Sequence, residues 1–311
     1  MTSPTYIGAD VAKAEVVVAT ATAVLGTFTN DRGGHRALVD RLRGMTLAAV
    51  VIESTGCYHR ELAIALSAAG LPVAIVQPGC VRHYAKGMGQ LAKSDAIDAR
   101  MIARFGAERE PRLWTMPQAE TAHLRALVDR RDQVVEMRTS EQNRLEACAD
   151  PFIARDLRRS IARLEKAVCA LDATIAAHIA AHEPLKRVSE ALQTEAGVGA
   201  QTAAVLLAHL PELGHINRQR VAALVGFAPY VHESGQRKGT VGIVGGRRRL
   251  RRALYMAAIS AARWNHWIAP LYRRLRERGK PAKVALVACG RKLVIRLNTI
   301  AARTHANTQP A

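Results

Sequence analysis

Residues 47–53 form an unbroken apolar run, Leu-Ala-Ala-Val-Val-Ile, that ends on Glu53. A strand with apolar side chains on both faces must be covered on both faces, which is typical of a central strand between layers of helices. Residues 5–11, 15–19 and 24–28 show the composition of three further strands joined by short turns. Helix and strand patterns then alternate, so the N-terminal part is predicted to be a mixed α/β sheet.

Four acidic residues fall where this sheet and a following helix can bring them together. Asp10 and Glu53 each end a predicted strand, and Asp95 and Asp98 lie three residues apart on one face of a predicted helix that Ser94 can cap. Carboxylate oxygens are the ligands that Mg²⁺ prefers, and such ions support phosphodiester chemistry. For each acid alone, the alternative is structural: a strand end that faces water, or a charge that stabilises a helix start.

Residues 113–190 have the pattern of long helices that follow a linker marked by Pro111 and Pro117. Asp150-Pro151 interrupts the pattern. Beyond it, apolar residues recur in alternating steps of four and three, the a/d seam of a heptad repeat: Leu157, Ile161, Leu164, Val168, Leu171 and Ile175. We expect a helical hairpin or coiled coil that separates two domains and can contribute to oligomerisation.

Positive charge is concentrated at the C-terminal end of the chain. The net charge is +19, and residues 235–311 hold 18 Lys or Arg against one acidic residue. Nucleic acid is the ordinary partner of such a field, whereas binding to an anionic membrane surface would require apolar anchors that this segment lacks. The densest run has no acids near it in the sequence to form ion pairs, so we interpret it as a stripe that binds the nucleic-acid backbone: Arg247, Arg248, Arg249, Arg251 and Arg252.

Residues 191–311 are predicted to form a mostly helical domain. Residues 195–202 resemble the glycine turn of a helix-hairpin-helix, in which backbone N–H groups hold a phosphate, although a plain glycine turn is the alternative. Trp264 and Trp267 are expected to be core residues in preference to a platform for base stacking. The absence of any long apolar run or N-terminal signal sequence, together with five scattered cysteines, predicts a cytoplasmic protein with reduced thiols.

Ser234 lies in a polar, glycine-flanked loop just before the basic block. Arg237 and Lys238 could neutralise a phosphate there, and Glu233 or His232 could accept the proton of the serine hydroxyl. On these residues alone, an ordinary exposed turn serine is the simpler interpretation. The residues around Ser234 are therefore compatible with a nucleophile but do not by themselves favour that role over an ordinary turn serine.

Three motifs in the N-terminal part together resemble the DEDD transposases of bacterial insertion sequences: IGADVAK at 7–13, IESTG at 52–56 and KSDAIDAR at 93–100. The sequence ESG at 233–235 and the segment 245–255 resemble the second domain of that family. The resemblance implies an RNase H-like domain related to the RuvC resolvases, Mg²⁺ bound by Asp10, Glu53, Asp95 and Asp98, and Ser234 as a nucleophile that becomes covalently linked to DNA. It also implies a tetramer and a structured bridge RNA that pairs with donor and target DNA.

We interpret the chain as a recombinase of a mobile element with three parts: a RuvC-like domain at 1–112, a helical spacer at 113–190 and a transposase domain at 191–311. Lys93, Arg237, Lys238 and the arginine run are the expected nucleic-acid contacts. One alternative is a Mg²⁺-dependent junction nuclease that uses water in place of Ser234. Another is a nucleic-acid-binding protein without catalysis, and a DNA invertase would be a variant with the same chemistry.

Overall fold

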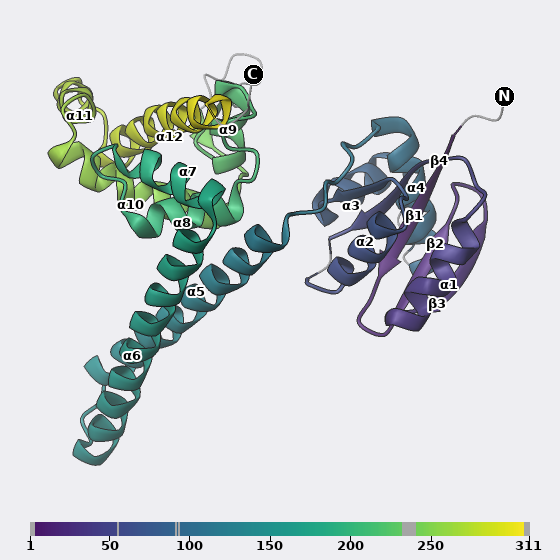
Figure 1. The fold of residues 1–311 in the computed structure, drawn as a ribbon, viewed down its shortest axis with the longest axis horizontal. Coiled ribbons are helices and arrows are strands. Elements are labelled where there is room, and N and C mark those ends of the chain that lie inside the picture. The colour runs from purple at the N-terminus through teal and green to yellow at the C-terminus, as the bar shows by residue number, and fades with distance from the viewer. Residues whose placement is uncertain (1–3, 55, 91, 93, 232–240, 308–311) are drawn as a thin grey trace. The chain divides into compact units, whose positions relative to one another are not determined.

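The computed structural model describes residues 4–54, 56–90, 92, 94–231 and 241–307. The chain divides into two compact units, residues 1–116 and 117–311, each with its own core. The first unit holds the mixed sheet, and the second is mostly helical (Figure 1). Among the described helices, none has both the length and the apolar character needed to cross a membrane.

The N-terminal unit is built on a five-stranded sheet with the order β3-β2-β1-β4-β5. β1 pairs antiparallel with β2, which pairs antiparallel with β3, while β1, β4 and β5 run parallel. The mixed α/β sheet predicted from the sequence is thus confirmed. The strands are β1 (Thr5–Val11), β2 (Glu15–Ala19), β3 (Val24–Thr29), β4 (Leu47–Glu53) and β5 (Val73–Val76).

Helices cover both faces of this sheet, which explains why the run at 47–53 is apolar throughout. Val50 and Ile52 of β4 pack in a core with α1 (Arg32–Leu42) and α2 (His59–Ala68). Val51 points to the other face, into a core with α3 (Pro78–Gly87) and α4 (Asp95–Arg109). Alternate side chains of a strand therefore enter two different cores.

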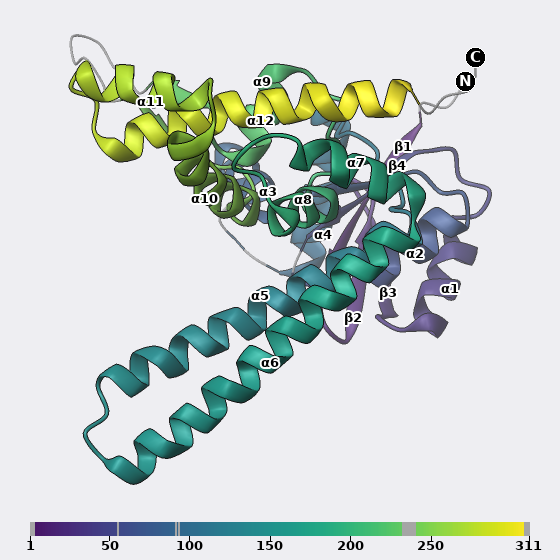
Figure 2. The same cartoon turned by 60° about the vertical axis from the view of Figure 1, so that its left-hand side comes forward.

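The second unit begins with a helical hairpin of α5 (Ala119–Glu146) and α6 (Pro151–Ala181), seen side by side in Figures 1 and 2. Asp150 starts α6 by accepting hydrogen bonds from the N–H groups of Phe152 and Ile153, and a proline at the first helical position suits the cap. The six predicted seam residues are all buried or half-buried along α6. That α5 and α6 form a true coiled coil remains a prediction.

The rest of this unit packs around α12 (Ala282–Ala306), which buries an apolar residue at every fourth position from Ala285 to Ala301. Around it lie α7 (Glu183–Gln193), α8 (Ala200–His209), α9 (Arg218–Val225), α10 (Arg248–Trp264) and α11 (Ile268–Glu277). A two-stranded sheet, β6 (Pro229–Val231) and β7 (Val241–Ile243), precedes α10.

The two tryptophans of this unit differ in their environment. Trp267 packs against the core, as predicted, and donates its indole N–H to Glu195. Trp264 is 78% exposed, so its assignment to the core was wrong. The reason is its position: it is the last residue of α10, beyond Ala261, the last buried residue of that helix.

Candidate functional site

The first turn of α4 lies at the edge of the sheet where the parallel strands β1 and β4 end. Helix α4 packs very closely on β1, and the contacts between them show its direction. A Cβ atom at Gly8 would stand 2.0 Å from the carbonyl oxygen of Ala99 and 2.5 Å from the nitrogen of Ala103. Further along α4, a Cβ at Gly106 would meet Val51 and Tyr6. As α4 advances, its contacts move back along β1, so its N-terminus is at the end where β1 and β4 finish.

This packing places the four predicted acids at the same edge of the sheet. Ala9 of β1 is in register with Ile52 of β4, so Asp10 and Glu53 are the next residues on two neighbouring parallel strands. Asp95 and Asp98 occupy the first turn of α4, which Ser94 caps by accepting from the N–H of Ile97 at 3.3 Å. The predicted N-cap is therefore confirmed, and it sets where the helix begins.

Asp10, Glu53 and Asp98 are half-buried at this edge, and Asp95 is exposed. In the described ranges, no three His, Cys, Asp or Glu side chains are grouped closely enough to hold a metal ion. The structure thus brings strand ends and helix start together without forming a closed cluster of ligands. Lys93, in the same motif, lies outside the described residues.

A hydrogen-bonded brace beside this edge was not foreseen from the sequence. The amide nitrogen of Asn30 donates to the carbonyl oxygens of Ala12 at 2.7 Å and Tyr58 at 3.3 Å, in the segments that follow β1 and β4. The side-chain oxygen of Asn30 lies 2.7 Å from Nε2 of buried His35. Burial lowers the pKa of His35, opposed in part by the charges of Asp31 and Glu61.

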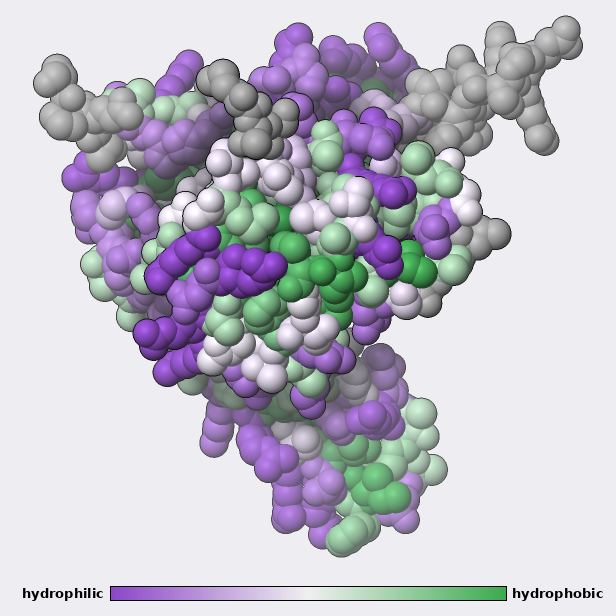
Figure 3. Space-filling view, turned by 90° about the vertical axis from the view of Figure 1, so that its right-hand side faces the viewer, coloured by the Kyte–Doolittle hydropathy of each residue, from purple (hydrophilic) through white to green (hydrophobic). Residues whose placement is uncertain are grey.

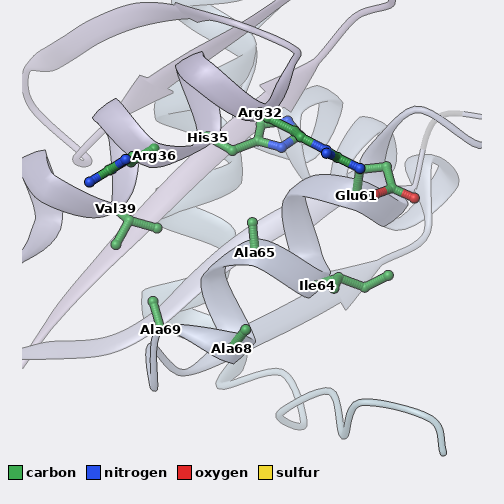
Figure 4. Close-up of a pocket in the computed structure, with 9 residues that line it drawn as sticks. All are labelled: Arg32, His35, Arg36, Val39, Glu61, Ile64, Ala65, Ala68 and Ala69. Carbon is green, nitrogen blue, oxygen red and sulfur yellow. The ribbon is translucent and has the colours of Figure 1, made fainter. Parts of the chain in front are cut away.

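His35 also borders a shallow groove between α1 and α2, with a volume of about 400 Å³. Residues of α1 and α2 line the groove, and Figure 4 shows the side chain of Arg32 on α1 extending toward Glu61 of α2. The groove lies on the face of the sheet covered by α1 and α2, opposite the face on which α4 packs. It is not part of the acidic edge.

Ser234, Arg237 and Lys238 lie outside the described residues, between β6 and β7. The turn that follows β7 packs closely against the end of α9. A Cβ at Gly246 would stand 2.3 Å from the nitrogen of Gly226, and Arg251 donates to the carbonyl of Gly245 at 2.7 Å. β7 therefore leads directly into the start of α10, next to the end of α9.

Three arginines at the start of α10 are paired with acids, contrary to the expectation that none would be near. Arg247, the N-cap residue, forms a bidentate ion pair with Glu212: Nη1 donates to Oε2 at 2.7 Å and Nη2 donates to Oε1 at 2.6 Å. Arg249 pairs with Asp129, and Arg252 lies 2.9 Å from Asp132. The expectation that no acids are close enough to pair with these arginines was wrong. The acids lie 35 to 120 residues earlier in the chain, on α5 and after α8, and only the fold brings them close.

Other basic side chains of this unit remain exposed. Arg248 on α10 is exposed, and no ion pair is formed by it within the described ranges. The same holds for a group on α11, the turn after it and the start of α12: Arg273, Arg274, Arg276, Arg278, Lys280 and Lys283. Since ion pairs neutralise three of the α10 arginines, this second run provides much of the accessible positive charge.

The glycine turn before α8 is held by a buried carboxylate that the sequence did not single out. Glu195, 4% exposed, accepts from Asn265 and Trp267, each at 2.6 Å, and pairs with Arg296. Burial opposes its ionisation, but these donors outweigh burial and lower the pKa of Glu195. Gly197, at φ +99°, lies against the backbone of Ala261. No local pattern reveals this network because its partners are 70 to 101 residues away.

Comparison with known proteins places the chain among transposases. Residues 7–153 match a family model described as a transposase of the DEDD, IS110 type, and residues 189–273 match the transposases of the IS116/IS110/IS902 family. Two curated relatives are pilin gene-inverting proteins, from Moraxella bovis at 29% identity and from Moraxella lacunata at 28%. Each alignment spans 305 residues and 94% of both chains.

Among solved structures, the chain is similar to T. thermophilus RuvC in complex with a Holliday junction substrate. That match covers 36% of this chain and all of the other, at 17% identity and a TM-score of 0.27, too weak to carry an argument. The two family models identify the family, because one matches the unit with the sheet and the other matches the helical unit. The chain thus belongs to the IS116/IS110/IS902 family of DEDD transposases and is a DNA recombination enzyme.

Proposed function

We propose that this enzyme cuts and exchanges DNA strands with Ser234 as nucleophile and with a divalent metal, Mg²⁺, bound by Asp10, Glu53, Asp95 and Asp98. The observation that supports it most is the acidic edge, because two strand ends and the first turn of α4 place four acidic residues at one edge of the sheet in a transposase. Oxygen donors of this kind fit Mg²⁺. When bound, the metal would stabilise charge that develops on the phosphate and activate the attacking hydroxyl.

In the proposed reaction, the Ser234 hydroxyl oxygen attacks the scissile phosphorus. Glu233 or His232 takes the proton of the serine, the bond from phosphorus to a deoxyribose oxygen breaks, and the same group then returns the proton to that leaving oxygen. The phosphodiester energy is kept in the phosphoserine. A free hydroxyl of a second DNA strand then attacks the same phosphorus and releases Ser234, so no external energy source is required.

We further propose that the enzyme works as a homo-oligomer, between a dimer and a tetramer, with a structured bridge RNA that selects donor and target DNA. The support is the resemblance of its motifs to bridge-RNA-guided recombinases and a basic surface without an evident base-reading module. The matched relatives are named as gene-inverting proteins, so site-specific inversion is a variant of the same proposal.

Covalent trapping tests this mechanism. The protein is incubated with Mg²⁺, DNA carrying the ends of its element, and RNA transcribed beside its gene, and is then denatured to detect a protein–DNA adduct. We expect the adduct in the wild type and in two controls, Ser140→Ala and Asp40→Asn, which remove a hydroxyl and a carboxylate elsewhere on the surface. Ser234→Ala and Asp98→Asn should both lose it.

Each rival predicts another outcome. Cleaved DNA without an adduct, undiminished in Ser234→Ala, would indicate a nuclease that uses water. DNA binding without strand cleavage in the wild type, unaltered by Asp98→Asn, would indicate a binding protein whose acids serve only the fold. Either result would overturn the serine mechanism.

A further inference from the structure

The distal half of α6 carries a stripe of basic side chains to which no role has been assigned. Arg155, Arg159, Arg163 and Lys166 follow one another at intervals of four, four and three residues, so they line one face of the helix. All four are exposed. We call this set the α6 stripe.

The α6 stripe points away from α5. The buried side of the helix is defined by Ala154, Leu157 and Val168, with Ile161 and Leu164 half-buried between them. At 100° per residue, the stripe lies opposite this seam. Within its own unit, the distal hairpin extends beyond the helices around α12, as Figure 2 shows, and Figure 3 shows hydrophilic residues along one side of it.

Within the described part of the chain, none of the four side chains of the α6 stripe forms an ion pair, although Asp156 lies three residues before Arg159. In contrast, Arg131, further from the tip of the hairpin, pairs with Asp172, and Arg144 pairs with Glu141. Like charges at spacings of three and four residues repel one another on a helix. An external anion bound along the stripe would relieve this repulsion.

We propose that the α6 stripe binds the phosphate backbone of a double-stranded nucleic acid. The four residues extend over about 16 Å of helix axis at ~1.5 Å per residue. That length matches about five phosphates of one strand at ~3.4 Å of axial rise each. Arginine suits phosphate through its planar set of donors. With neither aromatic nor amide side chains interspersed, the stripe would position nucleic acid without reading its sequence.

This inference rests on the proposed function, which requires that the protein hold nucleic acid. The test compares two triple variants of equal charge, Arg155→Gln/Arg159→Gln/Arg163→Gln and Arg43→Gln/Arg144→Gln/Arg187→Gln. The control arginines are also exposed, but each pairs with an acid three or four residues away. Binding to a 30-base-pair DNA duplex and to an RNA duplex of equal length is measured at several salt concentrations.

Each lost phosphate contact lowers the slope of log affinity against log salt by about 0.9. The stripe variant should therefore lower the slope by about 2 to 3, with the control within about 0.5 of the wild type. A larger change on one of the two duplexes identifies DNA or RNA as the ligand. Equal slopes for stripe and control variants would overturn the inference while leaving the proposed function intact, and absent binding by the wild type would overturn both. Circular dichroism verifies that both variants keep their helices.

Discussion

Asn30 joins the segments that follow β1 and β4, since its amide donates to the carbonyl oxygen of Ala12, two residues beyond Asp10. The same amide reaches Tyr58, five residues beyond Glu53, and Asn30 also contacts His35. One side chain on the turn after β3 thus couples two strand ends that carry proposed metal ligands. The acidic edge is therefore tied by hydrogen bonds to Asn30 and His35, which are outside the proposed set of metal ligands.

Replacing Asn30 with alanine should loosen this edge. The substitution removes the contacts to Ala12, Tyr58 and His35, and we expect a cost of about 1–3 kcal/mol to the N-terminal unit. Hydrogen exchange should accelerate at residues 10–13 and 56–60 while the C-terminal unit is unaffected. The matched control is Asn143→Ala on α5, an exposed asparagine. Equal exchange at residues 10–13 in both variants would show that the brace is not required.

The pH dependence of the N-terminal unit should reflect His35. Its folded-state pKa lies below the ordinary value of 6.5, mainly because of burial, so the unfolded chain binds the proton more readily. The contribution to stability is therefore complete above pH 6.5 and is lost as pH falls through the lowered pKa. His35→Gln, which can still contact Asn30, should flatten the decline in melting temperature as the pH falls below 6.5. Parallel profiles for both proteins would contradict the assignment.

Gly8 should be the least replaceable residue of β1. Its missing side chain allows α4 to lie against the strand, and an alanine Cβ would overlap the backbone of Ala99. We expect Gly8→Ala to cost about 3 kcal/mol, the upper range for overpacking, and to shift Asp95 and Asp98 from the sheet edge. Gly87→Ala, where nothing lies within 4 Å, is the control and should be neutral. Stability unchanged in Gly8→Ala would show that α4 can move away without loss.

Local sequence patterns predicted the elements of this fold better than the contacts between them. The apolar run at 47–53, the Ser94 cap and the break at Asp150-Pro151 are each determined by neighbouring residues, and each was found. Trp264 was misassigned because helix periodicity does not tell where the core ends along α10. The brace at Asn30 and the Glu195 network could not be anticipated, because their partners are distant in sequence and close only in the fold.

The arginines of α10 should separate into structural and nucleic-acid-binding groups. Arg252 contacts Asp132 and Glu136 on α5, and Asp132 is only 13% exposed, so their interaction is partly shielded from water. A double-mutant cycle of Arg252→Ala and Asp132→Ala should give a coupling of about 0.5–2 kcal/mol in unfolding of the C-terminal unit. Arg248, exposed on the same helix, should contribute little to stability.

Arg248 should contribute more than Arg252 to nucleic-acid binding, the reverse of their contributions to stability. Arg248→Gln should lower the salt slope of duplex binding by about 0.9, the value for one phosphate contact, and Arg252→Gln should lower it by less than half of that. The two variants have the same net charge and lie one helical turn apart, so each serves as the control for the other. Equal slopes together with zero coupling to Asp132 would mean that the pairs on α10 open when nucleic acid binds. The original interpretation of the whole run as a backbone-binding stripe would then hold.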